Sequence, residues 1–207
     1  MTRRIFIERT LRQIYNGQPT DDATITDNLV NVWLSDAIGI AAKQNYKENQ
    51  QIEGIGFVNN SFHTTYKALP IVADERNLWK VTLPELPVGI GSSEGMSRVV
   101  FKDSTNTVSF PGVPLSESQV GYARSMRPIP NKLLIYSEGG FCYVITPIVM
   151  TQYTASVTMV SGGDSTDLDS TLNVPSDYFP AMTEYIKSQL LLERKQMPDL
   201  QNDGRDN

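Results

Sequence analysis

The single histidine and the single cysteine, His63 and Cys142, are the first residues to consider for chemistry. His63 lies in "NNSFHTTYK", a predicted strand start, and no G-x-S-x-G nucleophile motif occurs in the chain. A small hydrolase site assembled in space around His63 stays an alternative, but a structural or exposed histidine is the simpler interpretation. Cys142 stands between two aromatic residues in a predicted strand, which is typical of a buried small hydrophobic residue.

Metal and phosphate sites are weakly indicated. One histidine and one cysteine do not supply the roughly four ligands of a usual zinc site. The loop "VGIGSSEGMS" contains Gly89, Gly91 and Gly95, but it lacks the spacing and the lysine of a phosphate-binding loop. We therefore predict a flexible loop there, and no catalytic residue, cofactor or metal site in the chain.

The loop "SGGDSTDLDST" brings Asp164, Asp167 and Asp169 close together in the sequence. Calcium needs about six to eight oxygen ligands, and the glycine and glutamate of an EF-hand do not fall in register from Asp164. An ordinary acidic loop is the favoured interpretation. A weak cation site between Asp164 and Asp169 stays open.

Four arginines, Arg3, Arg4, Arg9 and Arg12, form a basic cluster on the first predicted helix. Nucleic-acid binding by this cluster is an alternative, but a solvated helix face is the favoured interpretation because Glu8 and other acids lie nearby. The net charge of −5 and the pI of about 4.9 argue against extensive phosphate contacts.

The elements that must position these residues begin with two N-terminal helices. Thr2 is a predicted N-cap of the first helix, and Gly17 is placed to end it. The second helix begins near Thr24 or Thr26 and carries two apolar stripes, which predicts burial on more than one side, by another helix or another subunit. The first stripe is Ile25, Leu29, Trp33, Ala37 and Ile40, and the second is Val30, Leu34 and Ile38.

The middle of the chain has short apolar runs between glycines and prolines, which predicts a β-rich body. "SRVVFKD" and "NTVSF" flank a turn, and "KLLIYSEGGFCYVIT" is a second hairpin around Gly139 and Gly140. "HTTYKAL", "NLWKVTL" and the alternating "QYTASVTMV" are further strands, and "PLSESQVGYARSM" contains a short helix. We expect a sandwich or barrel.

The last helix follows Ser176 or Asp177 as N-cap, tolerates Pro180 in its first turn and stops at Pro198. Phe179, Met182, Ile186 and Leu190 form its apolar stripe. The fold class is therefore α+β, with N-terminal and C-terminal helices packed together on a central antiparallel β-sandwich or barrel-like body. The predicted parts are 1–54 (helical), 55–172 (β-rich), 173–197 (last helix) and 198–207 (extended tail).

The sequence also argues against a membrane span and a secretory signal. No apolar run approaches the roughly 20 residues of a membrane span, so we predict no membrane contact. The N-terminus "MTRRIFIERTLRQIYNG" has no apolar segment of the kind that follows the charges of a secretory signal.

The two ends of the chain resemble those of a known family. "NVPSDYFPAMTEYIKSQLLLERKQMPDLQNDGRDN" combines P-S-D-Y, an amphipathic helix and P-D-x-x-N-D-G-x-D, and "FIERTLRQIYNGQPTDDATIT" precedes a long helix. This layout resembles the bacteriophage head-to-tail connector and tail-adaptor proteins. It is most similar to the ring proteins of crAss-like short-tailed phages.

The resemblance implies a non-enzymatic virion protein, assembled in the host cytoplasm, that forms a ring in the portal–tail connector. It implies a homo-oligomer, commonly a dodecamer, that contacts the portal protein and neighbouring tail or ring proteins while DNA passes through the lumen without sequence-specific binding. The tail 198–207 is too polar to fold alone, and we interpret it as a docking segment.

The residues expected to carry these contacts fall into two groups. For subunit packing on the second helix they are Leu29, Trp33 and Ile40. For partner docking they are Tyr178, Phe179, Met197, Pro198, Leu200 and Arg205.

An alternative function is a tail or baseplate accessory β-module with a carbohydrate or protein ligand. Its sugar-stacking residues would be the aromatic side chains Tyr66, Trp79, Tyr122 and Tyr136, although packing in the core explains them as well.

Overall fold

The protein was analysed as a computed structural model, and its chain divides into two compact units. One is helical and comprises Met1–Ala41 and Gly163–Asn207; the other is Ala42–Gly162 and contains the strands. The division falls within the second helix, and the segment 163–172 groups with the helices. The structure describes residues 1–17, 26–75, 78–90, 95–105, 107–122, 125, 129–163 and 167–196.

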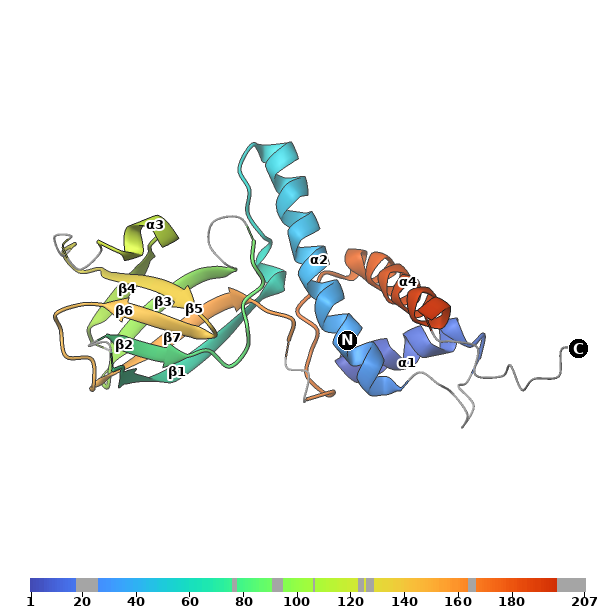
Figure 1. The fold of residues 1–207 in the computed structure, drawn as a ribbon, viewed down its shortest axis with the longest axis horizontal. Helices are drawn as coiled ribbons and strands as arrows, with labels where there is room; N and C mark the ends of the chain where they lie inside the picture. The colour runs from blue at the N-terminus through green and yellow to red at the C-terminus, as the bar shows by residue number, and fades with distance from the viewer. Residues whose placement is uncertain are drawn as a thin grey trace, which may run out of the picture. The chain divides into compact units, whose positions relative to one another are not determined.

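The architecture is α+β, as predicted: the N-terminal and C-terminal helices pack together, and the strands form a seven-stranded mixed barrel. The helices are α1 (Arg3–Ile14), α2 (Asp27–Glu53) and α4 (Phe179–Gln196), which the 3₁₀ turn η3 (Ser176–Tyr178) precedes (Figure 1). The end of α2 belongs to the second unit.

Helix α1 begins and ends through local chemistry. The Thr2 side chain accepts a hydrogen bond from the Ile5 amide, which confirms the predicted N-cap. At the other end the Gly17 amide donates to the Arg12 carbonyl (2.9 Å), and Asn16 adopts a left-handed conformation with φ 52°. Asparagine, not the predicted glycine, therefore occupies the left-handed position of a Schellman-type end.

The helical core comes from one apolar stripe of each helix. The α2 stripe Val30, Leu34 and Ile38 is fully buried, and α4 contributes Met182 and Ile186. Phe6 of α1 meets Phe179 of α4 edge-to-face, with ring centroids 5.7 Å apart. Each such aliphatic side chain contributes roughly 1.5–3 kcal/mol through burial, so the predicted three-helix packing is a substantial core.

The solvated-face interpretation is wrong for Arg3, which is only 1% exposed. Its Nε donates to Asn31 Oδ1 (2.9 Å), and its Nη2 donates to the Ser35 hydroxyl (2.8 Å) and the Asn31 carbonyl (3.2 Å). The guanidinium lies against α2, where a polar pair one turn apart supplies acceptors. A buried charge needs such hydrogen bonds, because leaving water without them is costly.

The chain start is also tied to the segment 168–172. The Arg4 amide donates to Leu168 O (2.8 Å), the Leu172 amide donates to Met1 O (3.0 Å), and Thr2 forms a β-bridge with Thr171. The exposed Arg4 side chain pairs with Asp169 at 2.8 Å. The first amides of α1, which have no partners inside the helix, are satisfied by this segment.

The second unit is a closed barrel with the strand order β1-β2-β6-β5-β4-β3-β7 (Figure 1). The turn η1 (Asn60–Phe62) precedes it, and α3 (Glu117–Val120) is inserted in it. Its strands are β1 (His63–Ala73), β2 (Trp79–Thr82), β3 (Met96–Asp103), β4 (Ser109–Pro114), β5 (Leu133–Glu138), β6 (Phe141–Ile145) and β7 (Tyr153–Val160).

Both predicted hairpins are confirmed, but the expectation of a purely antiparallel body is wrong. Strands β3–β4 and β5–β6 pair antiparallel, and Gly139 and Gly140 both have positive φ, as a tight two-residue turn requires. Strands β4 and β5 are parallel, with Val113 opposite Leu134. The long connection 115–132, which contains α3, allows this crossover, since parallel neighbours cannot be joined by a tight turn.

Alternation along the strands fills the barrel, as β7 illustrates. Its residues Ala155, Val157 and Met159 are fully buried, whereas Thr154, Ser156 and Thr158 on the other face are partly exposed. The core also contains Phe101, Ile135 and Val144. The alternating pattern read from the sequence is thus confirmed.

The Arg3 network yields a stability prediction. Asn31→Leu removes an acceptor from the buried guanidinium, and we expect the free energy of unfolding to fall by about 3 kcal/mol. The matched control is Arg4→Gln, which affects only the exposed pair with Asp169 and should leave the denaturation midpoint nearly unchanged. Urea denaturation measures both, and equal effects of the two variants would contradict the assigned role of Arg3.

Candidate interaction surfaces

The structure places His63 and Cys142, the two residues that suggested chemistry, in partly buried and fully buried positions. His63 begins β1 opposite Val160 and is partly buried. Burial lowers the pKa of His63 below its usual value, which keeps the imidazole neutral at neutral pH. Cys142 is fully buried inside the barrel, and burial raises the pKa of its thiol to about 12. Cys142 is thus the predicted small core residue.

Thiol reactivity tests this placement. With a pKa of about 12, on the order of one Cys142 thiol in ten thousand is ionised at pH 8, so a thiol reagent should not modify the folded protein. Unfolding restores an ordinary thiol pKa, and modification should then be complete within minutes. Rapid stoichiometric labelling of the folded protein would place Cys142 outside the core.

The glycine loop and the acidic loop lie partly outside the described residues, which exclude 91–94 and 164–166. In the acidic loop, the Asp169 carboxylate accepts a hydrogen bond from the Arg4 guanidinium, and this hydrogen bond lowers the pKa of that carboxyl. Asp167 Oδ1 accepts from the Asp169 amide (3.0 Å). Within the part of the chain that the structure describes, no group of three acidic, histidine or cysteine side chains could hold a metal ion.

The four aromatic residues considered for sugar stacking are in different environments. Tyr66 donates to Glu85 Oε1 (2.6 Å), Trp79 packs partly buried against the barrel core, and Tyr136 stacks on Tyr143 with ring centroids 5.0 Å apart. Tyr122 is largely exposed. Contacts within the barrel therefore account for three of the four.

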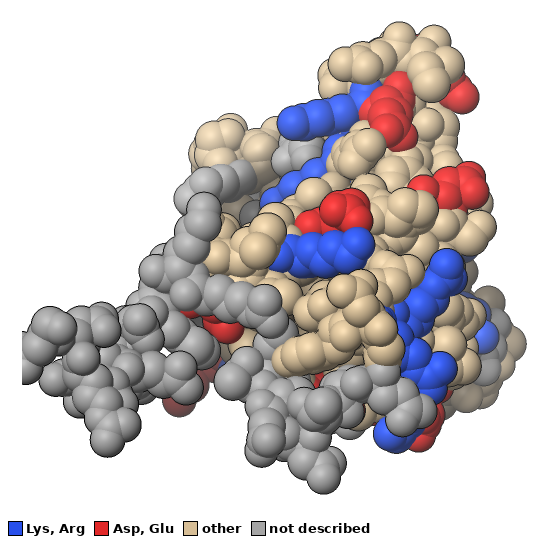
Figure 2. All heavy atoms as spheres, turned by 90° about the vertical axis from the view of Figure 1, so that its right-hand side faces the viewer, with Lys and Arg blue, Asp and Glu red and all other residues tan. Residues whose placement is uncertain are grey.

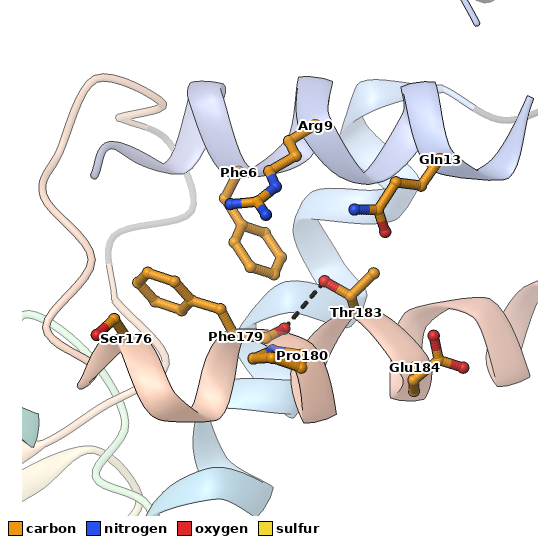
Figure 3. A pocket seen from close by; sticks show the side chains of 8 residues that line it. All are labelled: Phe6, Arg9, Gln13, Ser176, Phe179, Pro180, Thr183 and Glu184. Atoms are coloured by element: carbon orange, nitrogen blue, oxygen red, sulfur yellow. Dashed lines mark hydrogen bonds between the residues drawn. The ribbon is translucent and has the colours of Figure 1, made fainter. Parts of the chain in front are cut away.

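A groove of about 330 Å³ lies between α1 and α4 (Figure 3). The two sides of the groove come from different elements. Helix α1 supplies Phe6, Arg9 and Gln13. The region from η3 into α4 supplies Ser176, Phe179, Pro180, Thr183 and Glu184. We call it the α1–α4 groove.

The lining of the α1–α4 groove combines an apolar floor with charged edges. The buried Phe6 ring meets the partly exposed Phe179 ring edge-to-face at the floor of the groove, and the Arg9 side chain extends from α1 over them (Figure 3). Glu184, on the α4 edge, already accepts a hydrogen bond from Lys187 (2.7 Å). The groove thus offers aromatic carbon and a cationic edge, which fits an apolar segment that carries an acid.

The residues predicted for partner docking fall partly in this groove. Phe179 lines it, and Tyr178 lies next to it in η3. Met197, Pro198, Leu200 and Arg205 lie outside the described residues, as does the predicted stop at Pro198; the described helix extends to Gln196.

The three α2 residues predicted for subunit packing differ in how much of each side chain is exposed. Trp33 is 7% exposed, so its own chain already covers almost all of its surface. Leu29 is partly buried, and Ile40 is 45% exposed. Ile40 is thus the one of the three with a large free surface.

Several large apolar side chains of the three helices are not covered by the packing of the helices on one another. Val32 and Ile40 lie two turns apart on the same outward face of α2, with Asp36 between them. Each side chain of this set is roughly half exposed: Ile5, Val32, Ile40, Leu191 and Leu192. Of these, Val32 and Ile40 share one face of α2, and adjacent exposed apolar side chains of this kind are candidates for a contact with another protein.

Sequence reasoning missed a second apolar surface at the C-terminal end of α2. Ile52 is 81% exposed, Ile55 is 70% exposed and Phe57 is 38% exposed. We call these three residues the α2 tip. The signal was present in the sequence: two isoleucines and a phenylalanine lie beside Gly54 and Gly56, beyond the stripes that pack α2.

Charge on the helical unit is mixed. Figure 2 shows basic and acidic side chains interspersed among uncharged residues on the face that it draws, as far as that face is described. Arg3 is buried and Arg4 is paired, which leaves Arg9 and Arg12 as the exposed arginines of the predicted cluster. Two exposed arginines can make only a few phosphate contacts, which argues against strong nucleic-acid binding by this cluster.

Comparisons with protein-family models and with curated proteins gave no significant match. Among the described residues, none of the helices combines the length and the apolarity that crossing a membrane requires.

Proposed function

We propose that the chain is a structural virion protein that assembles with copies of itself into a ring of the portal–tail connector. The observation that carries the self-assembly is the apolar surface left on the three-helix unit, above all Val32 and Ile40 on the outward face of α2. The assignment to a portal–tail connector comes from the resemblance of the two chain ends to connector proteins.

Physical reasoning favours a second copy as the occupant of this surface. Two half-exposed apolar side chains on one helix face gain free energy when another surface covers them, and the same face is present on every copy. Contacts between different patches of identical subunits generate rings when the rotation closes. The barrel would then be repeated around the ring and present its surface to the neighbouring tail proteins.

The acidic composition also agrees with a passage for DNA. A net charge of −5 and interspersed surface charges provide little of the concentrated lysine and arginine that hold phosphates. A duplex would slide past such a surface without sequence-specific binding. The buried, un-ionised thiol of Cys142 agrees with a structural role.

The α2 face is tested by placing charge on it. Val32→Asp combined with Ile40→Asp should weaken self-association by at least about tenfold, because each side chain loses roughly 1.5–3 kcal/mol of burial in the contact. The melting temperature should fall by a few degrees while the chain stays folded, because both side chains are half exposed and each new carboxylate lies one turn from Asp36. Mass photometry over a concentration series measures the assembly.

The control for this experiment is Asn28→Asp, which adds charge one turn away on the same exposed face without removing an apolar side chain. It should assemble as the unmodified protein does. If the double variant assembles equally well, the α2 face is not the subunit contact.

The tail gives an independent prediction. Truncation after Met197 should leave the monomer folded, with unchanged circular dichroism and melting temperature, but should weaken assembly with neighbouring virion proteins. Replacing 198–207 by a Gly/Ser segment of equal length separates the effect of sequence from that of length. Full assembly by the truncated protein would show that the tail has no docking role.

A further inference from the structure

The α2 tip is built as a rigid apolar projection. The Gly54 amide donates to the Gln50 carbonyl (3.0 Å), and Gly54 takes φ 74°, so the chain turns sharply at the helix end. Gly56 lies against the Tyr46 ring so closely that an added Cβ would overlap it. The turn that carries Ile55 is therefore held against α2.

Hydrogen bonds of three asparagines hold the other side of this turn in place. Asn45 Oδ1 accepts from the Asn59 amide (2.9 Å), and Asn49 Nδ2 donates to the Phe57 carbonyl (2.9 Å). Asn45 is itself buried. A surface fixed in this way loses little conformational entropy on binding, which favours association.

We propose that the α2 tip of one copy of this chain inserts into the α1–α4 groove of the next copy. This inference rests on the proposed function and names one of the contacts by which the ring would form. It commits to a second copy because the chain itself carries both surfaces, and because they match in apolarity and in charge.

The apolar match is between the tip isoleucines and the aromatic floor of the groove. Ile52 and Ile55 would cover the partly exposed Phe179 ring and the exposed Pro180 side chain, while Phe6 is buried and packs against Phe179 from within the helical core. A cavity of about 150 Å³ holds a benzene molecule, so a groove of about 330 Å³ has room for two isoleucine side chains.

The charge match is between Glu53, which directly follows Ile52 of the α2 tip, and Arg9 at the groove edge. Both side chains are exposed, and neither forms an ion pair in the described part of its own chain. An acid beside Ile52 also disfavours an anionic membrane or nucleic acid as the occupant. Because the tip and the groove are different patches, the contact is heterologous and can propagate around a ring.

Disulfide trapping tests the contact. The double variant Ile55→Cys with Gln13→Cys places one cysteine at an exposed position of the tip and one at an exposed position of the groove. The native Cys142 is buried and unreactive. Mild oxidation of the assembled protein should give a ladder of cross-linked dimers and higher species on a non-reducing gel. Each single-cysteine variant is the control and should give no ladder.

Other outcomes identify other occupants. A cross-link that closes within one chain runs as a monomer and overturns the inference. A ladder from Gln13→Cys with Asn202→Cys, but not from Gln13→Cys with Ile55→Cys, assigns the groove to the C-terminal tail instead and also overturns it.

Charge reversal provides a second measurement on full-length protein. Glu53→Arg and Arg9→Glu should each weaken self-association roughly fivefold, and the two together should restore it. Absence of restoration in protein that still forms rings would overturn this contact and leave the proposed function in place. If the unmodified protein is monomeric alone and with its virion neighbours, the proposed function itself fails, which is seen before any substitution is made.

Discussion

The burial of the Arg3 guanidinium is the constraint on which the helical unit depends. It joins the first turn of α1 to Asn31 and Ser35 of α2, and the same turn is tied through its backbone to the segment 168–172. Segments that are far apart in sequence thus meet at the first turn of α1. Because an unsatisfied buried charge is costly, this arrangement favours a single docking of α1, and α1 forms one side of the groove that faces α4.

Much of the fold could be predicted because its signals are local. The Thr2 cap, the β5–β6 turn at Gly139 and Gly140 and the alternation of β7 each depend on neighbouring residues, and all three are confirmed. The parallel pairing of β4 with β5 could not be predicted, since strand direction is decided by a long crossover and not by side-chain pattern. The burial of Arg3 was missed because one arginine looks the same on a solvated or a buried face. The polar pair Asn31 and Ser35 on the inner side of α2 was the available signal.

The candidate surfaces were predictable to a lesser degree. Phe179 lies in the α1–α4 groove and Ile40 is exposed on α2, but Trp33 is used within its own chain. A helical stripe shows that a residue is covered and does not show whether its own chain or a neighbour covers it. The apolar residues of the α2 tip beside Gly54 and Gly56 are visible in the sequence, but their exposure needed the structure, because it follows from where the helix ends. The resulting picture is a barrel and a helical unit that both carry large apolar side chains on their surfaces.

The most direct test of this account is negative-stain imaging of the purified protein, alone and mixed with the proteins encoded beside it. The account predicts closed rings of many copies, formed by the protein alone or on addition of the portal protein. A particle that stays monomeric in both conditions would contradict it.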